Sequence, residues 1–389
     1  MRIAFVITRA DDLGGAQVHV RDISTALRDI GHEVVVLGGS DGILGDELRQ
    51  RGIRFCSLRH LVRPISPMRD LLAAWEIRRA LSDIRPDVVS THSSKAGILG
   101  RVAGRSLGIP TMFTAHGWAF AEGKSRQKRA LYRLIERAAA PLATRIITVC
   151  EAERDFAIKH RVAGPDKVVA VHNAVLDVDE TLRAEPAKSP PRLVVVARFD
   201  RQKDHPTLFR ALAGLLDLEW QLALVGGGPL RSKAESLAAE MSLSSRVSFL
   251  GLRKDVTDLL AQSQAFLLIT NWEGFPRSIL EAMRAGLPVV ASDVGGVSES
   301  VVDRETGFVI PRGDWVRLRS RLGVLLTDAE LRARMGAAGR ARYESRFPFP
   351  HLVSRTLAVY EEPHPLRTNG RRTGPVETPK HRPLPFSRR

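Results

Sequence analysis

The sequence predicts an α/β protein with two domains, each an open, doubly wound parallel sheet. Short apolar runs of strand length alternate with helical patterns along the chain, which is typical of βαβ units. At 389 residues the chain is too long for one ordinary core and suits two domains and a tail. A short Pro-rich stretch at 185–191 separates two such sets of strands. Ligands of such sheets gather at the carboxyl ends of the strands, so we expect the functional residues there.

Each half of the chain supplies one set of strands. In the first half, strands are expected at Arg2–Ile7, Glu33–Leu37, Asp87–Val89, Thr111–Thr114, Arg145–Val149 and Val168–Val171. Helical patterns fill the gaps, for example at His19–Asp29 and Met68–Ser82. In the second half, strands are expected at Arg192–Ala197, Gln221–Val225, Val247–Leu250, Ala265–Ile269, Leu287–Ala291 and Phe308–Ile310.

Three loops of the first half carry candidate ligand-binding residues. Gly14 and Gly15 follow the first strand but lack the G-x-G-x-x-G spacing, so a flexible turn and a ligand loop both remain open. Residues 91–97 are small and polar and should open a helix. His116 follows another strand beside Gly117, where a histidine can be either a hydrogen-bonded structural residue or a functional one.

In the second half, Arg198 and Lys203 follow the first strand of the set. Two cations at the carboxyl end of a strand would neutralise a diphosphate. A solvated loop could have the same composition, and the residues alone do not decide between the two. The Gly-rich loop 226–229, after the next strand, is a weak signal by itself.

Residues 264–299 are the most informative stretch and predict a strand, a loop, a helix and a second strand. Gly274 allows a tight turn and Pro276 suits the first turn of a helix. The amino-terminal end of that helix would attract an anion such as phosphate. Glu273 before the helix and Glu281 inside it could accept hydrogen bonds from hydroxyls, which suits a ligand with both phosphate and sugar. A solvated helix face with an incidental pair of glutamates is the alternative.

Much of the net charge of +16 lies in residues 124–137 and 364–389. Such patches suit nucleic acid, phospholipid head groups or phosphate-bearing substrates. Lys124–Arg137 reads as an amphipathic helix, either simply solvated or lying on an anionic membrane. The Pro- and Arg-rich stretch 363–389 lacks apolar periodicity and is expected to be a disordered basic tail. No recognised nucleic-acid-binding module accompanies the charge, so we expect no nucleic-acid partner. The sequence shows no membrane-spanning run and no signal peptide, and Cys56 and Cys150 fit no disulfide framework, so a cytoplasmic location is expected.

The stretch Trp-Glu-Gly-Phe-Pro…Leu-Glu-Ala-Met-x-Ala-Gly-Leu-Pro-Val-Val-Ala, from Trp272 to Ala291, resembles the donor-site signature of family-4 retaining glycosyltransferases. The segments Val294-Gly295-Gly296…Glu299 and Thr306–Val309 continue the pattern. The first half is similar to the branch that builds bacterial surface polysaccharides and exopolysaccharides, through residues 92–97, 116–120 and 135–137.

The resemblance implies the GT-B fold, in which two Rossmann-like domains with parallel sheets face each other across a cleft. The domains would be 1–180 for the acceptor and 192–346 for the nucleotide sugar, joined by a linker at 181–191. Residues 347–362 would form a C-terminal helix that crosses back to the N-terminal domain.

The resemblance also implies roles for single residues. Arg198 and Lys203 would hold the donor's diphosphate, and Glu281 the ribose hydroxyls. Glu273 would touch the sugar, beside the backbone N–H groups of Gly274 and Phe275. Three further positions would lie around the donor: Arg253 near the base, His116 facing the transferred sugar, and Gly15 lining the cleft.

The implied activity is transfer, with retention, of a hexose or N-acetylhexosamine from a nucleotide sugar, with UDP expected. The acceptor would be a growing, lipid-linked cell-surface polysaccharide, met at the inner face of the plasma membrane. No cofactor or metal is expected, although Asp177-Val178-Asp179 has the D-x-D pattern of metal-using sugar transferases. A nucleotide-sugar epimerase of the same fold is the alternative.

Overall fold

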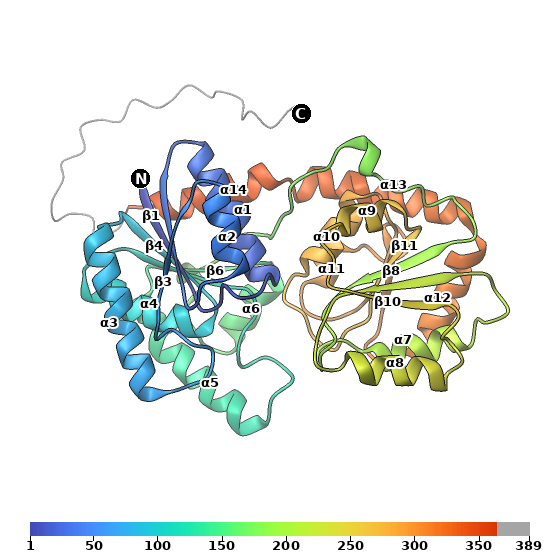
Figure 1. Ribbon diagram of the computed structural model, residues 1–389, viewed down its shortest axis with the longest axis horizontal. Coiled ribbons are helices and arrows are strands. Elements are labelled where there is room, and N and C mark those ends of the chain that lie inside the picture. Colours follow the sequence, from blue (N-terminus) through green and yellow to red (C-terminus); the bar gives the residue numbers. More distant parts are fainter. Residues whose placement is uncertain (364–389) are drawn as a thin grey trace.

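The computed structural model describes residues 1–363, which form two α/β domains side by side (Figure 1). Each domain is built on one sheet, and every pairing between neighbouring strands in both sheets is parallel. The predicted fold class is therefore confirmed. Residues 364–389, nearly all of the tail expected at 363–389, lie outside the described residues.

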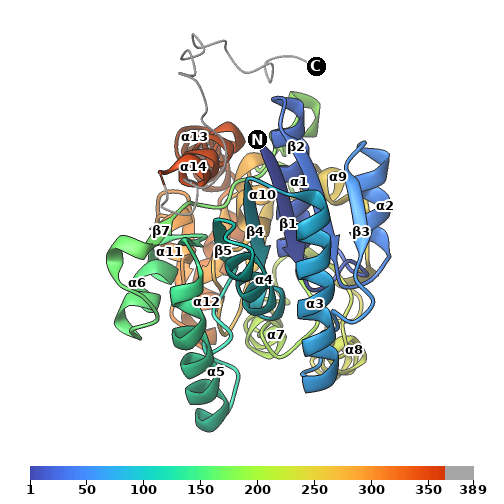
Figure 2. The same ribbon diagram turned by 90° about the vertical axis from the view of Figure 1, so that its left-hand side faces the viewer.

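The N-terminal domain has seven strands in the order β3-β2-β1-β4-β5-β6-β7. They are β1 (Arg2–Ile7), β2 (Glu33–Gly38), β3 (Arg54–Ser57), β4 (Val88–His92), β5 (Thr111–Ala115), β6 (Arg145–Thr148) and β7 (Val168–Ala170). Its helices are α1 (Gly15–Asp29), α2 (Ile43–Gln50), α3 (Pro67–Ile84), α4 (Ser94–Ser106), α5 (Arg126–Ala139) and α6 (Glu151–Lys159). Figure 2 shows α3, α4 and α5 on the near side of this sheet.

The C-terminal domain has six strands in the order β10-β9-β8-β11-β12-β13. They are β8 (Arg192–Val196), β9 (Gln221–Val225), β10 (Val247–Gly251), β11 (Ala265–Leu268), β12 (Val289–Ser292) and β13 (Gly307–Ile310). Its helices are α7 (His205–Ala213), α8 (Arg231–Glu240), α9 (Val256–Ala261), α10 (Arg277–Arg284), α11 (Val297–Ser300), α12 (Trp315–Thr327) and α13 (Ala329–Arg346). Short 3-10 turns complete the described connections. Those at Ala140–Leu142 and Pro165–Lys167 lie in the N-terminal domain, and the one at Glu180–Leu182 lies between the two domains.

The central strands are apolar throughout because both faces of each sheet are covered. In β1, Ile3, Phe5 and Ile7 face one core of the N-terminal domain, while Ala4 and Val6 face the other. All five are fully buried. This explains why the apolar runs in the sequence are continuous rather than alternating.

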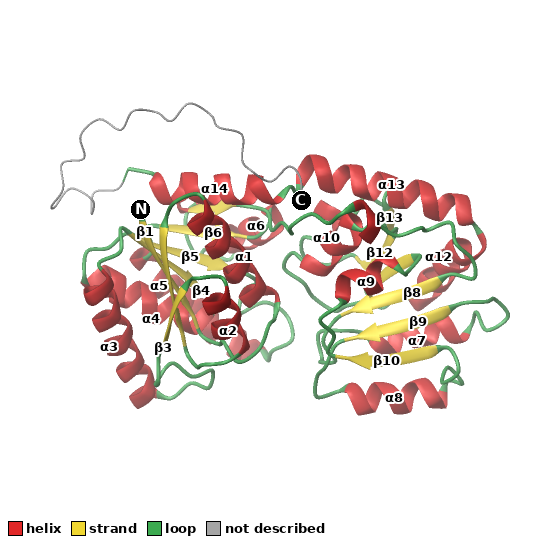
Figure 3. Cartoon of the chain, turned by 45° about the horizontal axis from the view of Figure 1, so that its top comes forward, coloured by secondary structure: helices red, strands yellow, loops and turns green. Residues whose placement is uncertain are grey.

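The last helix, α14 (Phe349–Glu361), packs against the N-terminal domain although it follows the C-terminal one. Figure 3 shows α13 and α14 following one another across both domains. Phe349, Leu352 and Val353 share a core with β1, and the Tyr360 hydroxyl donates a 2.7 Å hydrogen bond to Ser90 Oγ in β4. Within residues 1–363 the chain therefore connects the two domains twice.

The first connection runs through residues 176–191, and a buried arginine holds it. Arg332 of α13 donates hydrogen bonds to the carbonyl oxygens of Pro186 at 2.7 Å and Lys188 at 3.0 Å. It is fully buried, so these bonds satisfy a charge that would otherwise be costly.

None of the helices in residues 1–363 combines the length and the apolar character that crossing a membrane would need.

Candidate active site

The candidate residues lie in loops at the carboxyl ends of parallel strands. The loop after β8 carries Arg198 and Lys203, and the loop after β11 carries Glu273. Since β8 and β11 are neighbours, these two loops meet at the same edge of the C-terminal sheet. Loops of the N-terminal domain contact them: Asp12, after β1, pairs with Arg198, and His116, after β5, lies against Gly274. The site is therefore built from both domains.

Lys203 and Glu273 form an ion pair between the Lys203 ammonium and Glu273 Oε1. Their side chains are 12% and 9% exposed. Two further groups hold the carboxylate, because Thr270 Oγ1 donates to Oε1 at 3.0 Å and Gln202 Nε2 donates to Oε2 at 3.0 Å. A carboxylate with three donors has a fixed orientation, which is what a ligand-positioning group needs.

Close backbone packing fixes the loop that carries Glu273. A Cβ at Gly274 would lie 2.8 Å from the carbonyl oxygen of His116, so a side chain there would push the two domains apart. Gly295 has φ +55°, and a Cβ there would lie 2.0 Å from the Glu273 carbonyl oxygen. The amide of Gly296 donates to the Gly274 carbonyl at 2.8 Å. The Phe275 side chain is buried in the core, so only its backbone could face a ligand.

Helix α10 begins immediately after this loop, and its polar face contacts the N-terminal domain. Arg277 donates to Asp22 Oδ2 of α1 at 2.6 Å and to the Ala174 carbonyl at 2.8 Å. Arg284 donates to the Leu176 carbonyl at 2.8 Å. Both arginines are buried. The alternative of a solvated helix face is therefore wrong: this face carries contacts between the domains.

Glu281 lies on the same helix and is partly buried. Burial raises the pKa of its carboxyl group, and the nearby Arg277 and Arg284 oppose that shift. Within residues 1–363, no side chain or amide donates a hydrogen bond to this carboxylate. Its oxygens are thus available to hydroxyl groups of a ligand.

Arg198 and Lys203 share one loop, but neither is a free cation. Arg198 Nη1 donates to Asp12 Oδ2 at 2.7 Å across the domain boundary, while Lys203 is paired with Glu273. Both residues expected to hold a diphosphate are thus paired with carboxylates here, and their diphosphate-binding role stays a prediction. A diphosphate would have to compete with Asp12 for Arg198 or bind the remaining N–H groups of Lys203.

The other two positions expected around the donor lie in different settings. Gly15 opens α1, and a Cβ there would lie 4.0 Å from Cδ of Arg277, so it faces the C-terminal domain. Arg253 is exposed on the loop after β10 and pairs with Asp255 at 2.8 Å and 2.5 Å. The contacts of the described residues do not bring Arg253 together with Lys203 or Glu273.

His116 belongs to a cluster of three histidines. His92 Nδ1 and His116 Nε2 are 3.0 Å apart, and the ring centroids of His19 and His116 are 4.8 Å apart. Burial lowers the pKa of His92 and of His116 well below the usual range, and lowers that of His19 to about 4. All three are therefore neutral at physiological pH. One ring nitrogen from each lies within 4.8 Å of the others, so this cluster could hold a metal ion.

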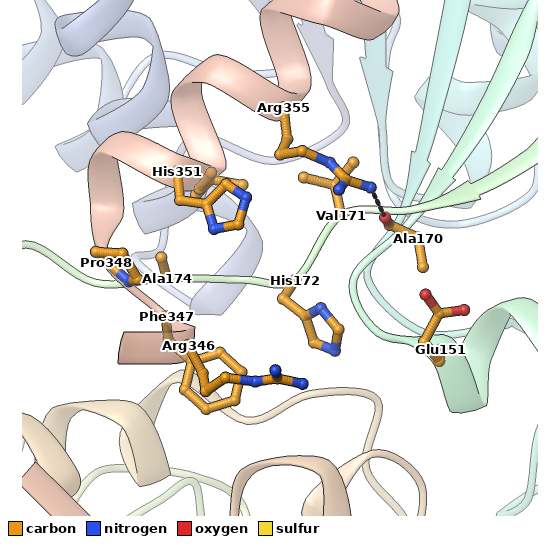
Figure 4. A pocket seen from close by; sticks show the side chains of 11 residues that line it. Glu151, Ala170, Val171, His172, Ala174, Arg346, Phe347, Pro348, His351 and Arg355 are labelled. Atoms are coloured by element: carbon orange, nitrogen blue, oxygen red, sulfur yellow. Dashed lines mark hydrogen bonds between the residues drawn. The ribbon is translucent and has the colours of Figure 1, made fainter. Parts of the chain in front are cut away.

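Two hollows lie near the domain boundary. One, of about 480 Å³, is lined by Gln202 and Trp272 together with Asp200, Arg201, Pro229 and Leu230. It adjoins the Lys203–Glu273 pair, because Gln202 contacts Glu273. The other, of about 160 Å³, lies where α14 begins and is lined by side chains that include His172, Arg346 and Arg355 (Figure 4). None of the candidate residues lines this second pocket.

Known proteins match both halves of the chain. A family model described as glycosyl transferases group 1 matches residues 178–342, and one described as glycosyl transferase 4-like domain matches residues 14–174. The UDP-Gal:alpha-D-GlcNAc-diphosphoundecaprenol alpha-1,3-galactosyltransferase of Escherichia coli is 32% identical over 273 residues, which are 65% of this chain and 70% of that protein. The chain belongs to the family-4 glycosyltransferases.

More distant matches agree with this assignment. The O-antigen biosynthesis glycosyltransferase WbnH of Escherichia coli is 24% identical over 301 residues, 77% of this chain and 83% of that protein. The crystal structure of Anabaena Alr3699/HepE in complex with UDP and glucose matches with a TM-score of 0.79 at 20% identity. It covers 92% of this chain and 99% of that one, and it supports the GT-B fold.

Several residues of the candidate site were not predicted from the sequence. Asp12, Gln202 and Thr270 contact the predicted residues, and His19 joins the histidine cluster from helix α1. Asp12, Gln202 and His19 lie far in the sequence from the residues that they contact. Thr270 lies close to Glu273 in the sequence but belongs to no distinctive motif. Only their position after the strands β1, β8 and β11 could have drawn attention to Asp12, Gln202 and Thr270.

The D-x-D pattern of this glycosyltransferase is engaged by protein groups. Arg340 donates to both carboxylate oxygens of Asp177, at 2.5 Å and 2.7 Å. Asp179 accepts from the amide and hydroxyl of Thr181, at 3.0 Å and 2.8 Å. The two carboxylates therefore hold the interdomain connection, and the expectation that catalysis uses no metal remains a prediction.

Proposed function

We propose that this glycosyltransferase moves a hexose or N-acetylhexosamine from a UDP-sugar to a lipid-linked glycan, with retention at the anomeric carbon. The observation that carries the proposal is the arrangement at the carboxyl ends of β8 and β11. There Glu273 is held by Lys203, and Glu281, to which no side chain or amide of residues 1–363 donates, follows on α10. The galactosyltransferase relative, whose name specifies a UDP-sugar and a diphosphoundecaprenol-linked sugar, supports this choice of substrates.

In this proposal each charged group has a distinct role. Glu281 accepts the ribose hydroxyls, and Glu273 accepts a sugar hydroxyl while its other bonds keep it in place. Lys203 shares its remaining N–H groups with the diphosphate, and Arg198 leaves Asp12 to do the same. The amino-terminal ends of α10 and α1, which carry partial positive charge, face the same region and add to the attraction.

The reaction needs no protein nucleophile. The bond between the anomeric carbon and the diphosphate oxygen breaks as the acceptor oxygen bonds to the same face of that carbon. The acceptor's hydroxyl proton passes to the departing diphosphate, which leaves as UDP. Charge develops on the diphosphate as the bond breaks, so Lys203 and Arg198 accelerate the reaction by stabilising it.

A reaction with defined substrates tests this proposal. The protein is incubated with UDP-galactose, UDP-glucose or their N-acetyl counterparts and with a polyprenyl-diphosphate-linked sugar. We expect a glycolipid product whose new linkage keeps the α configuration of the donor. Inverted configuration would contradict retention. Epimerised free donor without any glycolipid would instead establish the epimerase alternative.

We further propose that the protein reaches its lipid-linked acceptor by lying on the anionic inner face of the plasma membrane. Helix α5 exposes Leu134 (63%) beside basic side chains. Helix α3 exposes Met68 and Trp75. Helix α4 contacts both, and all three lie on one side of the N-terminal domain (Figure 2). Exposed apolar groups beside cations are the composition that binds anionic lipid surfaces.

Sedimentation with lipid vesicles tests the membrane proposal. Replacing Lys128, Arg133 and Arg137, which are exposed on α5, by Gln should weaken sedimentation with vesicles that contain phosphatidylglycerol. A matched variant replaces Lys233, Arg304 and Arg317, which are exposed on the C-terminal domain. Equal sedimentation of the two variants would remove the role of α5.

A further inference from the structure

A line of hydrogen bonds runs from the C-terminal helix α14 to His116. The Tyr360 hydroxyl donates to Ser90 Oγ at 2.7 Å, and Ser90 Oγ lies 3.0 Å from His92 Nε2. His92 Nδ1 lies 3.0 Å from His116 Nε2. Tyr360, Ser90 and His92 are at most 1% exposed, whereas His116 is partly exposed. The line thus begins in the core and ends at the domain boundary.

The chemistry of these groups gives the line a direction. Because Tyr360 donates to Ser90, the Ser90 hydroxyl has to place its own proton elsewhere, and a buried hydroxyl rarely leaves a proton unpaired. Its other contact in residues 1–363 is His92 Nε2, which therefore accepts. A neutral imidazole has one protonated nitrogen, so His92 carries its proton on Nδ1 and donates it to His116 Nε2. His116 must then carry its own proton on Nδ1.

This assignment requires all three titratable groups to be neutral. Burial lowers the pKa of His92 and of His116 well below the usual range, so neither ring takes a second proton near pH 7. Burial also raises the pKa of Tyr360, which keeps the phenol protonated and able to donate. The cationic Arg277 nearby further lowers the pKa of His116.

We propose that Tyr360, Ser90 and His92 are positioning residues that fix the tautomer of His116, so that it presents Nδ1–H as a hydrogen-bond donor. No contact of the described residues occupies His116 Nδ1, and His116 adjoins Gly274 in the loop that carries Glu273. The identity of the receiving group, a hydroxyl or ring oxygen of the transferred sugar, rests on the proposed function. The tautomer itself does not.

A metal bound by His19, His92 and His116 would exclude this arrangement. Both nitrogens of His92 already have partners, since Nε2 accepts from Ser90 and Nδ1–H donates to His116. A metal ligand needs an unprotonated nitrogen with a free lone pair. Binding of a metal ion by the three histidines would break the hydrogen bond between His92 and His116. The observed contacts favour the hydrogen-bonded line.

Nitrogen-15 NMR of histidine-labelled protein, without any substrate, tests the tautomer directly. In the wild type we expect His116 to show a protonated Nδ1 and an unprotonated Nε2, with the signals assigned by their loss in His116→Gln. The reverse pattern on His116 would overturn the proposal. Adding one equivalent of zinc chloride should leave the three histidines unchanged. Loss or shift of all three sets of signals would establish a metal site instead.

Variants test whether α14 sets the tautomer. In Tyr360→Phe and Ser90→Ala, a second tautomer of His116 should appear. Tyr343→Phe is the matched control, since Tyr343 is equally buried but donates to the Val175 carbonyl at 3.0 Å. We expect the control to keep the wild-type pattern. An unchanged His116 spectrum in both test variants would show that α14 does not set the tautomer.

Once a donor is known, kinetics add a second readout. Tyr360→Phe should lower kcat about tenfold with little change in the donor KM, because one hydrogen bond made in the transition state is weakened. Tyr343→Phe should change neither constant. Failure to find any transferase activity would count against the proposed function and leave the NMR result intact. Equal kcat in wild type and Tyr360→Phe would contradict a catalytic consequence of the tautomer.

Discussion

Two glutamates of the same sequence signature have different surroundings. Glu273 accepts hydrogen bonds from three protein groups, whereas no described residue donates to Glu281. The signature in the sequence named both residues, but it contains nothing that distinguishes a carboxylate held by the protein from one left for a ligand. That difference depends on Gln202 and Thr270, whose contacts arise only when β8 and β11 lie next to each other.

Replacement of Glu281 by Gln is expected to raise the KM for the sugar-nucleotide donor about tenfold and to change kcat less. A carboxylate binds hydroxyls more strongly than an amide does, by about 1.5 kcal/mol for a charged hydrogen bond. Steady-state kinetics with varied donor check this. Glu305→Gln, an exposed position of the same domain, is the control. An unchanged donor KM in Glu281→Gln would remove its ribose-binding role.

The free energy of unfolding is expected to depend on pH through Glu153. This residue lies buried on α6, and its Oε2 has no hydrogen-bond partner among the described residues. Burial raises the pKa of its carboxyl group to about 7. The folded protein therefore holds this proton more tightly than the unfolded chain, and the free energy of unfolding falls as pH rises from about 4.5 to 7. Glu153→Gln should be more stable than wild type by about 3 kcal/mol above pH 7 and similar to it near pH 4. Urea denaturation at both pH values measures this, and equal differences at the two pH values would contradict it.

At the scale of elements, buried strands were the easiest to predict. The predicted runs at Arg2–Ile7 and Gln221–Val225 coincide with β1 and β9 because both faces of these strands are covered. Strand β3, Arg-Phe-Cys-Ser, was missed because it lies at the sheet edge and none of its residues is fully buried. A solvated polar face of α10 remained open as an alternative, since a sequence does not reveal that a second domain covers a charged face.

The loops after β1 and β8 allow a test of the contact between the domains. Asp12→Asn should free Arg198 for the diphosphate and lower the donor KM by up to about fivefold, the range for a half-exposed ion pair. Asp11→Asn is the control, because Asp11 pairs with Arg9 instead. A higher KM in Asp12→Asn would mean that the pair supports the bound arrangement rather than competing with the donor.

At the scale of the whole molecule, the site depends on contacts between residues far apart in the chain. The sequence predicted the two-domain fold because each sheet has its own strands, helices and turns. The family resemblance implied a last helix that returns to the N-terminal domain, but not its hydrogen bond to Ser90. Nor was it predicted that Glu299 of α11 would accept hydrogen bonds from His172 and from two amides at the start of α6. Such contacts arise when folded segments pack against each other, and no local sequence pattern encodes that packing.

The described site lies entirely within residues 1–363, so removal of residues 364–389 is expected to leave transferase activity unchanged. The comparison is between kcat/KM of the full chain and of a chain that ends at Pro363, with the same donor and acceptor. A large decrease in kcat/KM would show that the basic tail takes part in the reaction or in meeting the acceptor.

The central claim is that a nucleoside diphosphate binds at the carboxyl ends of β8 and β11. Calorimetric titration of UDP into wild type, Lys203→Ala and Lys188→Ala tests it most directly, with Lys188 as an exposed lysine paired with Glu185 in the linker. We expect one UDP per chain, binding that is at least about tenfold weaker in Lys203→Ala, and wild-type binding in Lys188→Ala. Equal affinity for UDP in wild type and Lys203→Ala, or no binding of UDP to the wild type at millimolar concentration, would contradict it.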